Sequence, residues 1–263
     1  MALISVFVLS FGLVVGSFLN VLIYRLPRNL NFVKGRSFCP KCKTKIHWSD
    51  NIPLLSFLML RGKCRACKSP ISPRYPLVEI VTGVLTVLIF NFQFTIFNQL
   101  LNFQIIFSFI CYLLLTWGLI VIFLIDLENQ IIPDEILLPL IGLFLIKTAF
   151  PPLNSKFLIL NSMTSAVGAF LFLFIIYLVT KGRGMGFGDV KLAFLMGLSL
   201  GFPKIIVAFY VAFLTGAFAG IILILGSKAK LKQKIAFGPF LSFATLTTIL
   251  WGEKILGFVL ALL

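Results

Sequence analysis

The chain has 263 residues, of which 60% are hydrophobic and only 12% are charged, and its mean hydropathy is +1.09. A water-soluble core of this length cannot hide so much apolar surface, so the composition excludes an ordinary soluble protein and predicts a membrane protein. The formal net charge of +15 is typical of basic loops that orient a membrane protein and attract anionic headgroups. We therefore expect membrane lipid, and no nucleic acid, as the partner of these charges.

Apolar runs long enough to cross a bilayer occur along the whole chain, since a spanning helix needs about 20 mostly apolar residues. The first run has no basic residue before its core and is too long for a signal peptide, so we expect it to be a retained span. The predicted fold class is an all-α polytopic membrane protein with about eight transmembrane helices, within a range of seven to nine. The predicted spans are 2–24, 77–93, 105–125, 132–150, 157–180, 188–202, 204–226 and 235–251.

The loop after the first span fixes the expected orientation. Between Arg25 and Arg74 lie 12 of the 23 Lys and Arg residues, and Asp50 is the only acid there. Such a loop is expected on the cytoplasmic side. Counting spans outward places the basic segments 181–191 and 227–234 on that same side, which makes the alternation self-consistent.

The same loop carries two CxxC pairs with 21 residues between them: Cys39 with Cys42, and Cys64 with Cys67. Four thiolates at this spacing can surround one zinc ion tetrahedrally. The alternatives are two disulfides, which are disfavoured on the cytoplasmic face, or four free thiols. With all four coordination positions filled by thiolates, the zinc is expected to be structural. A domain of about 50 residues needs such a metal crosslink to fold. His47 is expected to be a solvated loop residue.

Two aspartates lie at the ends of predicted spans, where a carboxylate is unusual. Asp126 follows VIFLI at the end of the third predicted span, and Asp189 precedes VKLAFL at the start of the sixth, so both lie at a similar depth. An ionisable group at membrane depth indicates function. Two carboxyl groups brought together share one proton; the charged one can deprotonate a water while the protonated one donates to a carbonyl oxygen, as in aspartic proteases.

The stretch GMGFGDVK places glycines at 184, 186 and 188, directly before Asp189. Without side chains, this backbone can let an extended peptide lie close to the carboxylate. The competing interpretation is a tight turn in which the aspartate caps the next helix. A Ser–His or HExxH protease is disfavoured, because the single histidine lies in the basic loop.

With these residues, the chain resembles the type IV prepilin peptidases, bifunctional leader peptidase/N-methyltransferases. The stretches that carry the resemblance run in the family's order from end to end of the chain. They are GSFLNVLIYRLP (16–27), the two CxxC pairs, ISPRYPLVE (71–79), IDLENQIIPD (125–134) and GMGFGDVKL (184–192).

The resemblance implies a multi-pass GxGD aspartyl protease of the bacterial inner membrane. Such enzymes remove the basic leader from type IV prepilins and type II secretion pseudopilins, after a glycine and on the cytoplasmic side. They then methylate the new N-terminal residue with S-adenosylmethionine. Carried over by motif, the catalytic pair is Asp126 and Asp189, with Gly186 and Gly188 as substrate-site backbone. Asp134 is expected to have a supporting role at most.

The residues for methyl transfer are harder to assign, because the chain shows no glycine-rich signature of a soluble methyltransferase. By resemblance it belongs to the first span and the zinc loop, where Gly62, Lys63 and Glu79 are the candidates. For Glu79, an ion pair with Arg74 or another base of the loop is an equal alternative. The expected domains are a first span (1–24), a cytoplasmic zinc-binding domain with four cysteine ligands (25–76) and a transmembrane aspartyl peptidase domain (77–263).

Three other functions compete with this prediction. A member of the family could be a peptidase without methyltransferase activity. A transporter could also place acids at helix ends, although the chain shows no convincing inverted repeat and its acids lie on one face of the membrane. A scaffold that docks through the zinc loop would leave the two aspartates without a role.

Overall fold

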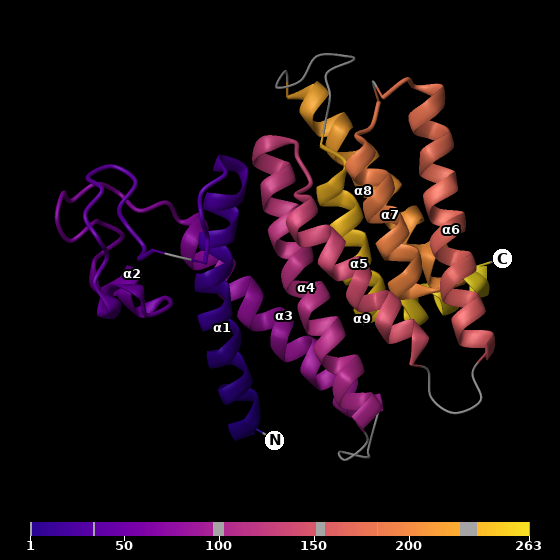
Figure 1. Cartoon of the computed structure of the whole chain (residues 1–263), viewed down its shortest axis with the longest axis horizontal. Coiled ribbons are helices and arrows are strands. Elements are labelled where there is room, and N and C mark those ends of the chain that lie inside the picture. The colour runs from indigo at the N-terminus through magenta and orange to yellow at the C-terminus, as the bar shows by residue number, and fades with distance from the viewer. Residues whose placement is uncertain are drawn as a thin grey trace. The chain divides into compact units, whose positions relative to one another are not determined.

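The computed structural model describes residues 2–33, 35–96, 103–150, 156–182, 184–226 and 236–262. Within these ranges the regular structure is helical, and the only β-type pairing is two isolated bridges. The chain divides into two compact units, Met1–Asn98 and Gln99–Leu263, which are coloured indigo to purple and magenta to yellow in Figure 1. Arg183 and the basic segment 227–234, both used above for orientation, lie outside the described residues.

Unit 1 is built on two long apolar helices, α1 (Ala2–Arg25) and α3 (Arg74–Ile96), which pack against each other. Small residues let them approach closely: a Cβ on Gly16 would lie 2.7 Å from the Cα of Glu79. Between the helices the chain forms a loop with only short helical pieces. These are η1 (Leu26–Arg28), η2 (Trp48–Asn51) and α2 (Leu55–Met59).

Unit 2 is a helical bundle (Figure 1). Within it α7 packs against α5, α6 and α9, while α4 packs against α5 and α9, and α8 against α9. The elements are α4 (Phe103–Asn129), α5 (Asp134–Ala149), α6 (Lys156–Val179), α7 (Phe187–Leu200), α8 (Lys204–Leu225) and α9 (Gly238–Leu262).

Helix α7 is the inner element of unit 2, since nine of its 14 residues are buried. A Cβ on Gly197 would lie 2.6 Å from the Cα of Ala166, so only glycine lets α7 and α6 pack this closely. Beyond α7, the side chain of Asn161 accepts from the amide of Phe202 and donates to its carbonyl, both at 3.0 Å. These bonds satisfy the backbone of the turn into α8.

The all-helical class and the membrane character of the sequence are confirmed in the described residues. Every predicted span overlaps a helix, and five helices are long and apolar enough to cross a membrane: α1, α3, α4, α6 and α8. Helices α5 and α7 have only 16 and 14 residues. At about 1.5 Å per residue, α7 rises roughly 21 Å, less than the hydrocarbon thickness. The count of eight therefore stays a prediction.

Candidate functional site

The two predicted catalytic aspartates lie together in unit 2. Asp126 is in the last turn of α4 and Asp189 in the first turn of α7, and their residues are only 5% and 6% exposed. The two carboxyl groups are close enough for their charges to interact. The fold therefore brings together two acids that are 63 positions apart in the sequence.

The beginning of α9 forms a wall of this site that the sequence analysis did not include. The backbone N–H of Gly238 lies beside the Asp126 carboxylate. A Cβ at position 238 would lie 2.6 Å from Asp126 Oδ2, so no larger residue fits without displacing the acid. Oδ2 itself is buried and has no hydrogen-bond partner in the structure. This orphaned oxygen is available to a proton, a water or a substrate.

Ile132, in the connection between α4 and α5, packs against the backbone on both sides of the acid pair. Its side chain would contact a Cβ on Gly188 at 3.0 Å and one on Gly238 at 3.1 Å. The start of α7 and the start of α9 are therefore both fitted to the same isoleucine. The sequence IDLENQIIPD thus supplies an acid and, six residues later, an apolar residue that packs against the starts of α7 and α9.

Asp189 also caps its own helix, because its Oδ2 accepts a hydrogen bond from the amide of Gly186 at 3.0 Å. The capping interpretation of GFGD is thus correct as geometry, and it occupies only one of the two carboxylate oxygens. The two glycines differ. Gly188 is tightly packed on Ile132, whereas a Cβ on Gly186 would meet nothing closer than 3.6 Å, and its φ of −79° suits any residue.

Asp134 does not join the acid pair as a third buried carboxyl. It is exposed at the start of α5, and both of its oxygens accept hydrogen bonds of 2.8 Å from Lys191 Nζ. This ion pair connects α5 to α7 two residues beyond Asp189. Its position fits the supporting role expected for Asp134.

In unit 1, the two CxxC pairs form two knuckles of the same shape. Bridges join Phe38 to Lys45 and Lys63 to Pro70, one around each pair. In each knuckle, the first cysteine's amide donates to the carbonyl five residues on, as Cys39 does to Thr44 at 3.0 Å and Cys64 to Ser69 at 2.8 Å. The lysine after each second cysteine has a positive φ, 60° at Lys43 and 57° at Lys68. Each turn therefore aims both of its sulfurs to one side.

The four sulfurs of Cys39, Cys42, Cys64 and Cys67 lie within 4.8 Å of one another, and Cys39 Sγ is 3.9 Å from Cys67 Sγ. Zn–S bonds of about 2.3 Å at tetrahedral angles separate sulfurs by roughly 3.8 Å, so the cluster fits a metal ion of that kind. Hydrogen bonds from the side chain and the backbone of Ser69 lower the pKa of the Cys67 thiol to about 6, which favours the thiolate that binds metal. His47 is exposed, bonds to Ser49 and is outside the cluster.

The methyltransferase candidates Gly62 and Lys63 are part of the second knuckle. Gly62 has a φ of +65°, and its carbonyl accepts from the amide of Ile71 at 2.7 Å. The positive φ therefore explains why a glycine occupies this position. Lys63 pairs through its backbone with Pro70, and its side chain is exposed.

Glu79 is buried in α3, with 8% of the residue exposed. Its Oε2 accepts from the amide of Leu54 at 2.9 Å, and the hydroxyl of Ser17 on α1 lies nearby. The ion pair with Arg74 that was considered from the sequence is not formed by Glu79 in this structure. The carboxylate instead joins α1, α3 and the cysteine-containing loop through neutral donors.

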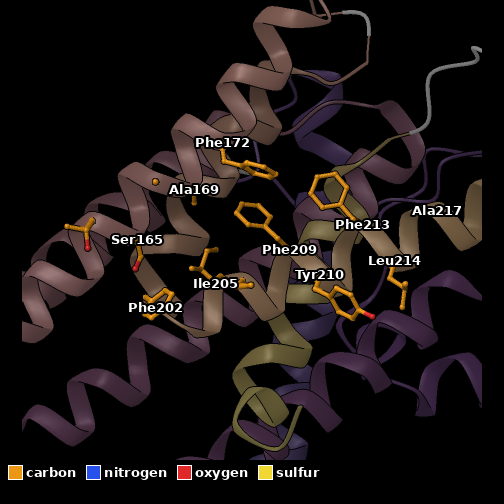
Figure 2. A pocket seen from close by; sticks show the side chains of 13 residues that line it. Ser165, Ala169, Phe172, Phe202, Ile205, Phe209, Tyr210, Phe213, Leu214 and Ala217 are labelled. Atoms are coloured by element: carbon orange, nitrogen blue, oxygen red, sulfur yellow. The ribbon is translucent and has the colours of Figure 1, made fainter. Parts of the chain in front are cut away.

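A cavity of about 850 Å³ lies between α6 and α8, lined mainly by apolar side chains such as Phe172, Phe209 and Phe213 (Figure 2). Neither Asp126 nor Asp189 lines it. Its wall carries the hydroxyl groups of Thr164, Ser165 and Tyr210 but no carboxylate, thiol or imidazole. The acid pair, and not this cavity, is therefore the candidate catalytic site of unit 2.

Comparison with known proteins agrees with the division into units. A profile described as the bacterial peptidase A24 N-terminal domain matches residues 10–93, and one described as the type IV leader peptidase family matches residues 113–221. A prepilin leader peptidase/N-methyltransferase of Stutzerimonas stutzeri is 36% identical over 277 residues, which covers 94% of this chain and 90% of the relative. The chain belongs to the type IV leader peptidase family.

Other relatives of this family give the same result. Proteins named prepilin leader peptidase/N-methyltransferase from Aeromonas hydrophila and Neisseria gonorrhoeae are each 36% identical, over 94% and 88% of this chain and 91% and 85% of the relatives. No solved structure matches the chain. Together with its five long apolar helices, membership of the family makes the chain an integral membrane protein.

Sequence reasoning missed Gly238, Ile132 and Asn20. Gly238 begins a helix at FGPF, and the Gly-Pro pair marks a helix start without saying what that start faces. Ile132 is one apolar residue among many in its segment. Asn20 on α1 is an amide inside an apolar run, a signal that was visible and is taken up below.

Proposed function

We propose that this chain is a membrane-embedded aspartyl endopeptidase that removes the basic leader from type IV prepilins and type II secretion pseudopilins, cutting after a glycine on the cytoplasmic side of the bacterial inner membrane. The same protein then methylates the new N-terminal residue with S-adenosylmethionine. The observation that carries the peptidase part is the meeting of Asp126 and Asp189 at the ends of two helices, both buried, with Asp126 Oδ2 unpaired.

Because the pair shares one proton, the two aspartates have different roles in the reaction. One aspartate, as the carboxylate, takes a proton from the attacking water while the other, as the acid, donates its proton to the carbonyl oxygen of the scissile bond. The amide of Gly186 donates to Asp189 and holds its orientation, and the start of α9 at Gly238 packs against Asp126. Because Gly186 has no close neighbour beyond Asp189 and Gly188, an extended substrate backbone can lie against it.

The orientation and the span count are part of the same proposal. Eight crossings place the end of α4 and the start of α7, and with them both acids, on the side of the basic loop between Arg25 and Arg74. Positively charged loops remain in the cytoplasm. A substrate whose leader is basic and whose cut site lies at the membrane surface would reach the acids from that side.

The knuckles are proposed to hold one structural zinc through Cys39, Cys42, Cys64 and Cys67. A zinc with four thiolate ligands has no open position, so it supplies folding energy to the loop and no Lewis-acid chemistry. Methyl transfer is assigned to unit 1, where Lys63 and Glu79 are the candidates, with Gly62 as a structural neighbour. The names of the relatives support methyl transfer as an activity of this chain, since they include both activities.

The test compares Asp126→Asn, Asp189→Asn and a control, Glu253→Gln. Glu253 is an exposed acid of α9 that pairs with Lys204 at 2.9 Å. Each dyad variant should cut a synthetic prepilin at least about 10²-fold more slowly, because each acid has its own proton-transfer role, while the control should cut normally. All three should insert and show wild-type thermal unfolding. A dyad variant with near wild-type cleavage would show that the reaction uses other residues.

A further inference from the structure

The interface between α1 and α3, which we call the seam, is the most closely packed part of unit 1. A Cβ on Gly12 would lie 2.8 Å from the Cα of Gly83, and one on Gly83 would lie 3.0 Å from the side chain of Leu13. Thr82 and Thr86 face this seam fully buried, and each hydroxyl donates to a carbonyl of its own helix at 2.7 Å. These two polar groups therefore need no further partner.

Glu79 lies in the same seam, and its charge is not compensated. Its hydrogen-bond donor, the Leu54 amide, is neutral, and so is the nearby Ser17 hydroxyl. Among the described residues no lysine or arginine forms an ion pair with it. Buried carboxylates are normally paired with a cation, so a positive partner is missing here.

Asn20 lies at the same level of the seam, and one of its two polar side-chain atoms lacks a partner. Its Nδ2 donates to the carbonyls of Tyr75, one turn before Glu79, and Gly16, whose Cα region packs directly on Glu79. Its Oδ1 is buried and accepts no hydrogen bond, and the residue is only 4% exposed. An acceptor without a donor and a carboxylate without a cation are thus held at one level between the two helices.

The loop that contains the cysteines is strained to reach this point. Leu54, whose amide bonds to Glu79, has a φ of 60° and a ψ of −48°. This combination is unfavourable for a residue with a side chain, and such strain is typical of sites that fix a functional group. The carboxylate is therefore oriented from the loop side as well as from α1.

We propose that Glu79 and Asn20 form a binding site for a small organic cation, and that this cation is a reactant of methyl transfer. The inference rests on the proposed methyltransferase function. Two reactants have the required chemistry: the sulfonium of S-adenosylmethionine, and the α-ammonium of a peptide that has lost its leader. The carboxylate supplies the opposite charge, and Asn20 Oδ1 supplies an acceptor that an ammonium N–H can fill.

The experiment measures binding, not turnover, with the full-length protein purified in detergent micelles and loaded with zinc. Calorimetric titrations use two matched pairs of probes that differ in one positive charge. The first pair is S-adenosylmethionine and its neutral thioether S-adenosylhomocysteine. The second is a peptide that begins with the mature phenylalanine, with a free and with an acetylated N-terminus.

We expect the wild type to bind the cation of one pair at least about tenfold more tightly than its neutral partner. A preference in the first pair assigns the site to the sulfonium, and one in the second to the ammonium. Glu79→Gln should remove most of that preference, and Glu79→Asp should retain part of it. Asn20→Leu should weaken binding of the same cation. Thr86→Val, which removes a self-satisfied hydroxyl farther along the seam, should change nothing.

Circular dichroism and zinc content show which variants are folded. If Glu79→Gln does not fold, Asn20→Leu becomes the deciding variant, and unchanged binding of the cation would overturn the site. No charge preference in the wild type, or a preference that survives Glu79→Gln, would also overturn it and leave Glu79 as an anchor for Leu54. Methylation of the pre-cut peptide by the wild type is measured in parallel, because its absence contradicts the proposed function itself.

Discussion

Lys191 donates to both carboxylate oxygens of Asp134, each at 2.8 Å, and so joins α5 to α7 beside the acid pair. The side chains of Lys191 and Asp134 are 28% and 50% exposed, so the pair is screened by solvent and contributes on the order of 0–1 kcal/mol. It therefore supports the position of α7 and is not needed for proton transfer.

Asp134→Asn should accordingly lower the rate of leader cleavage by less than about tenfold, since an asparagine can still accept from Lys191. The measurement is kcat/KM on a synthetic prepilin beside the Asp189→Asn protein. Lys191→Met, which removes the donor, should have an effect of similar size. Inactivation by Asp134→Asn as complete as that by Asp189→Asn would make Asp134 a member of the catalytic set.

Gly186→Ala tests whether the glycine before Asp189 is kept for the substrate. The backbone there has an ordinary φ and the nearest atom to a new Cβ is 3.6 Å away, so folding should be unaffected. A bound peptide backbone would lose its close approach, and KM should rise about tenfold or more. The control is Gly168→Ala on α6, where a Cβ meets nothing within 4 Å. Equal kinetics for the two variants would contradict a substrate role for Gly186.

Gly238→Ala tests the wall that α9 contributes to the site. The new methyl group would lie 2.6 Å from Asp126 Oδ2, so the acid or the helix start must move. A displacement of about 1 Å costs roughly 10²-fold in rate when reacting groups are aligned, and we expect a loss of that size in kcat. The helix itself should tolerate alanine, so thermal unfolding should change little. Normal cleavage would show that Gly238 does not position Asp126.

The sequence predicts this fold better than it predicts the surroundings of the acids. Hydrophobic runs define the helices, because a segment that crosses lipid must be apolar over most of its length. Asp126, Asp189 and the cysteines stand out by their residue type. Gly238 and Ile132 do not, since their importance comes from packing between segments about 100 residues apart in the chain. Packing of this kind is a property of the tertiary structure and leaves no periodic signal.

Glu79 shows a second limit of the sequence. From the charges alone, a pair with Arg74 was as reasonable as a functional role, because 12 bases lie in the preceding loop. In the structure Glu79 accepts a hydrogen bond from the amide of Leu54 and forms no ion pair with Arg74. Composition indicates which charges are available, whereas the loop conformation decides which of them meet.

The cysteine cluster should hold about one equivalent of zinc, and Cys64→Ser should lower the zinc content and the protease resistance of residues 30–75. The loop depends on the metal because it has few buried apolar groups: Leu30, Val33, Trp48, Leu55 and Met59 are all exposed. Cys111→Ala is the control, since Cys111 is buried in α4 and outside the cluster. Protein prepared under reducing conditions that contains no zinc would remove the metal from the proposal.

The last prediction is that cleavage and methyl transfer use different residues. The acid pair belongs to unit 2, whereas Lys63 and Glu79 belong to unit 1. Asp189→Asn should therefore still methylate a synthetic peptide that begins with the mature phenylalanine, because that peptide needs no cut. Lys63→Ala should lower methylation about tenfold or more and leave cleavage nearly unchanged, since loss of one charged hydrogen bond costs about 1.5–3 kcal/mol.

Radiolabelled methyl transfer to the pre-cut peptide, measured beside cleavage of the uncut one, separates the two activities. Lys41→Ala is the matched control, because Lys41 is an exposed lysine inside the other knuckle. Zinc content must stay at the wild-type level, so that a general collapse of the loop is not mistaken for a loss of chemistry. Equal loss of both activities in correctly inserted Asp189→Asn protein would argue for one shared site. Wild-type protein that cuts but never methylates would make this chain a peptidase alone.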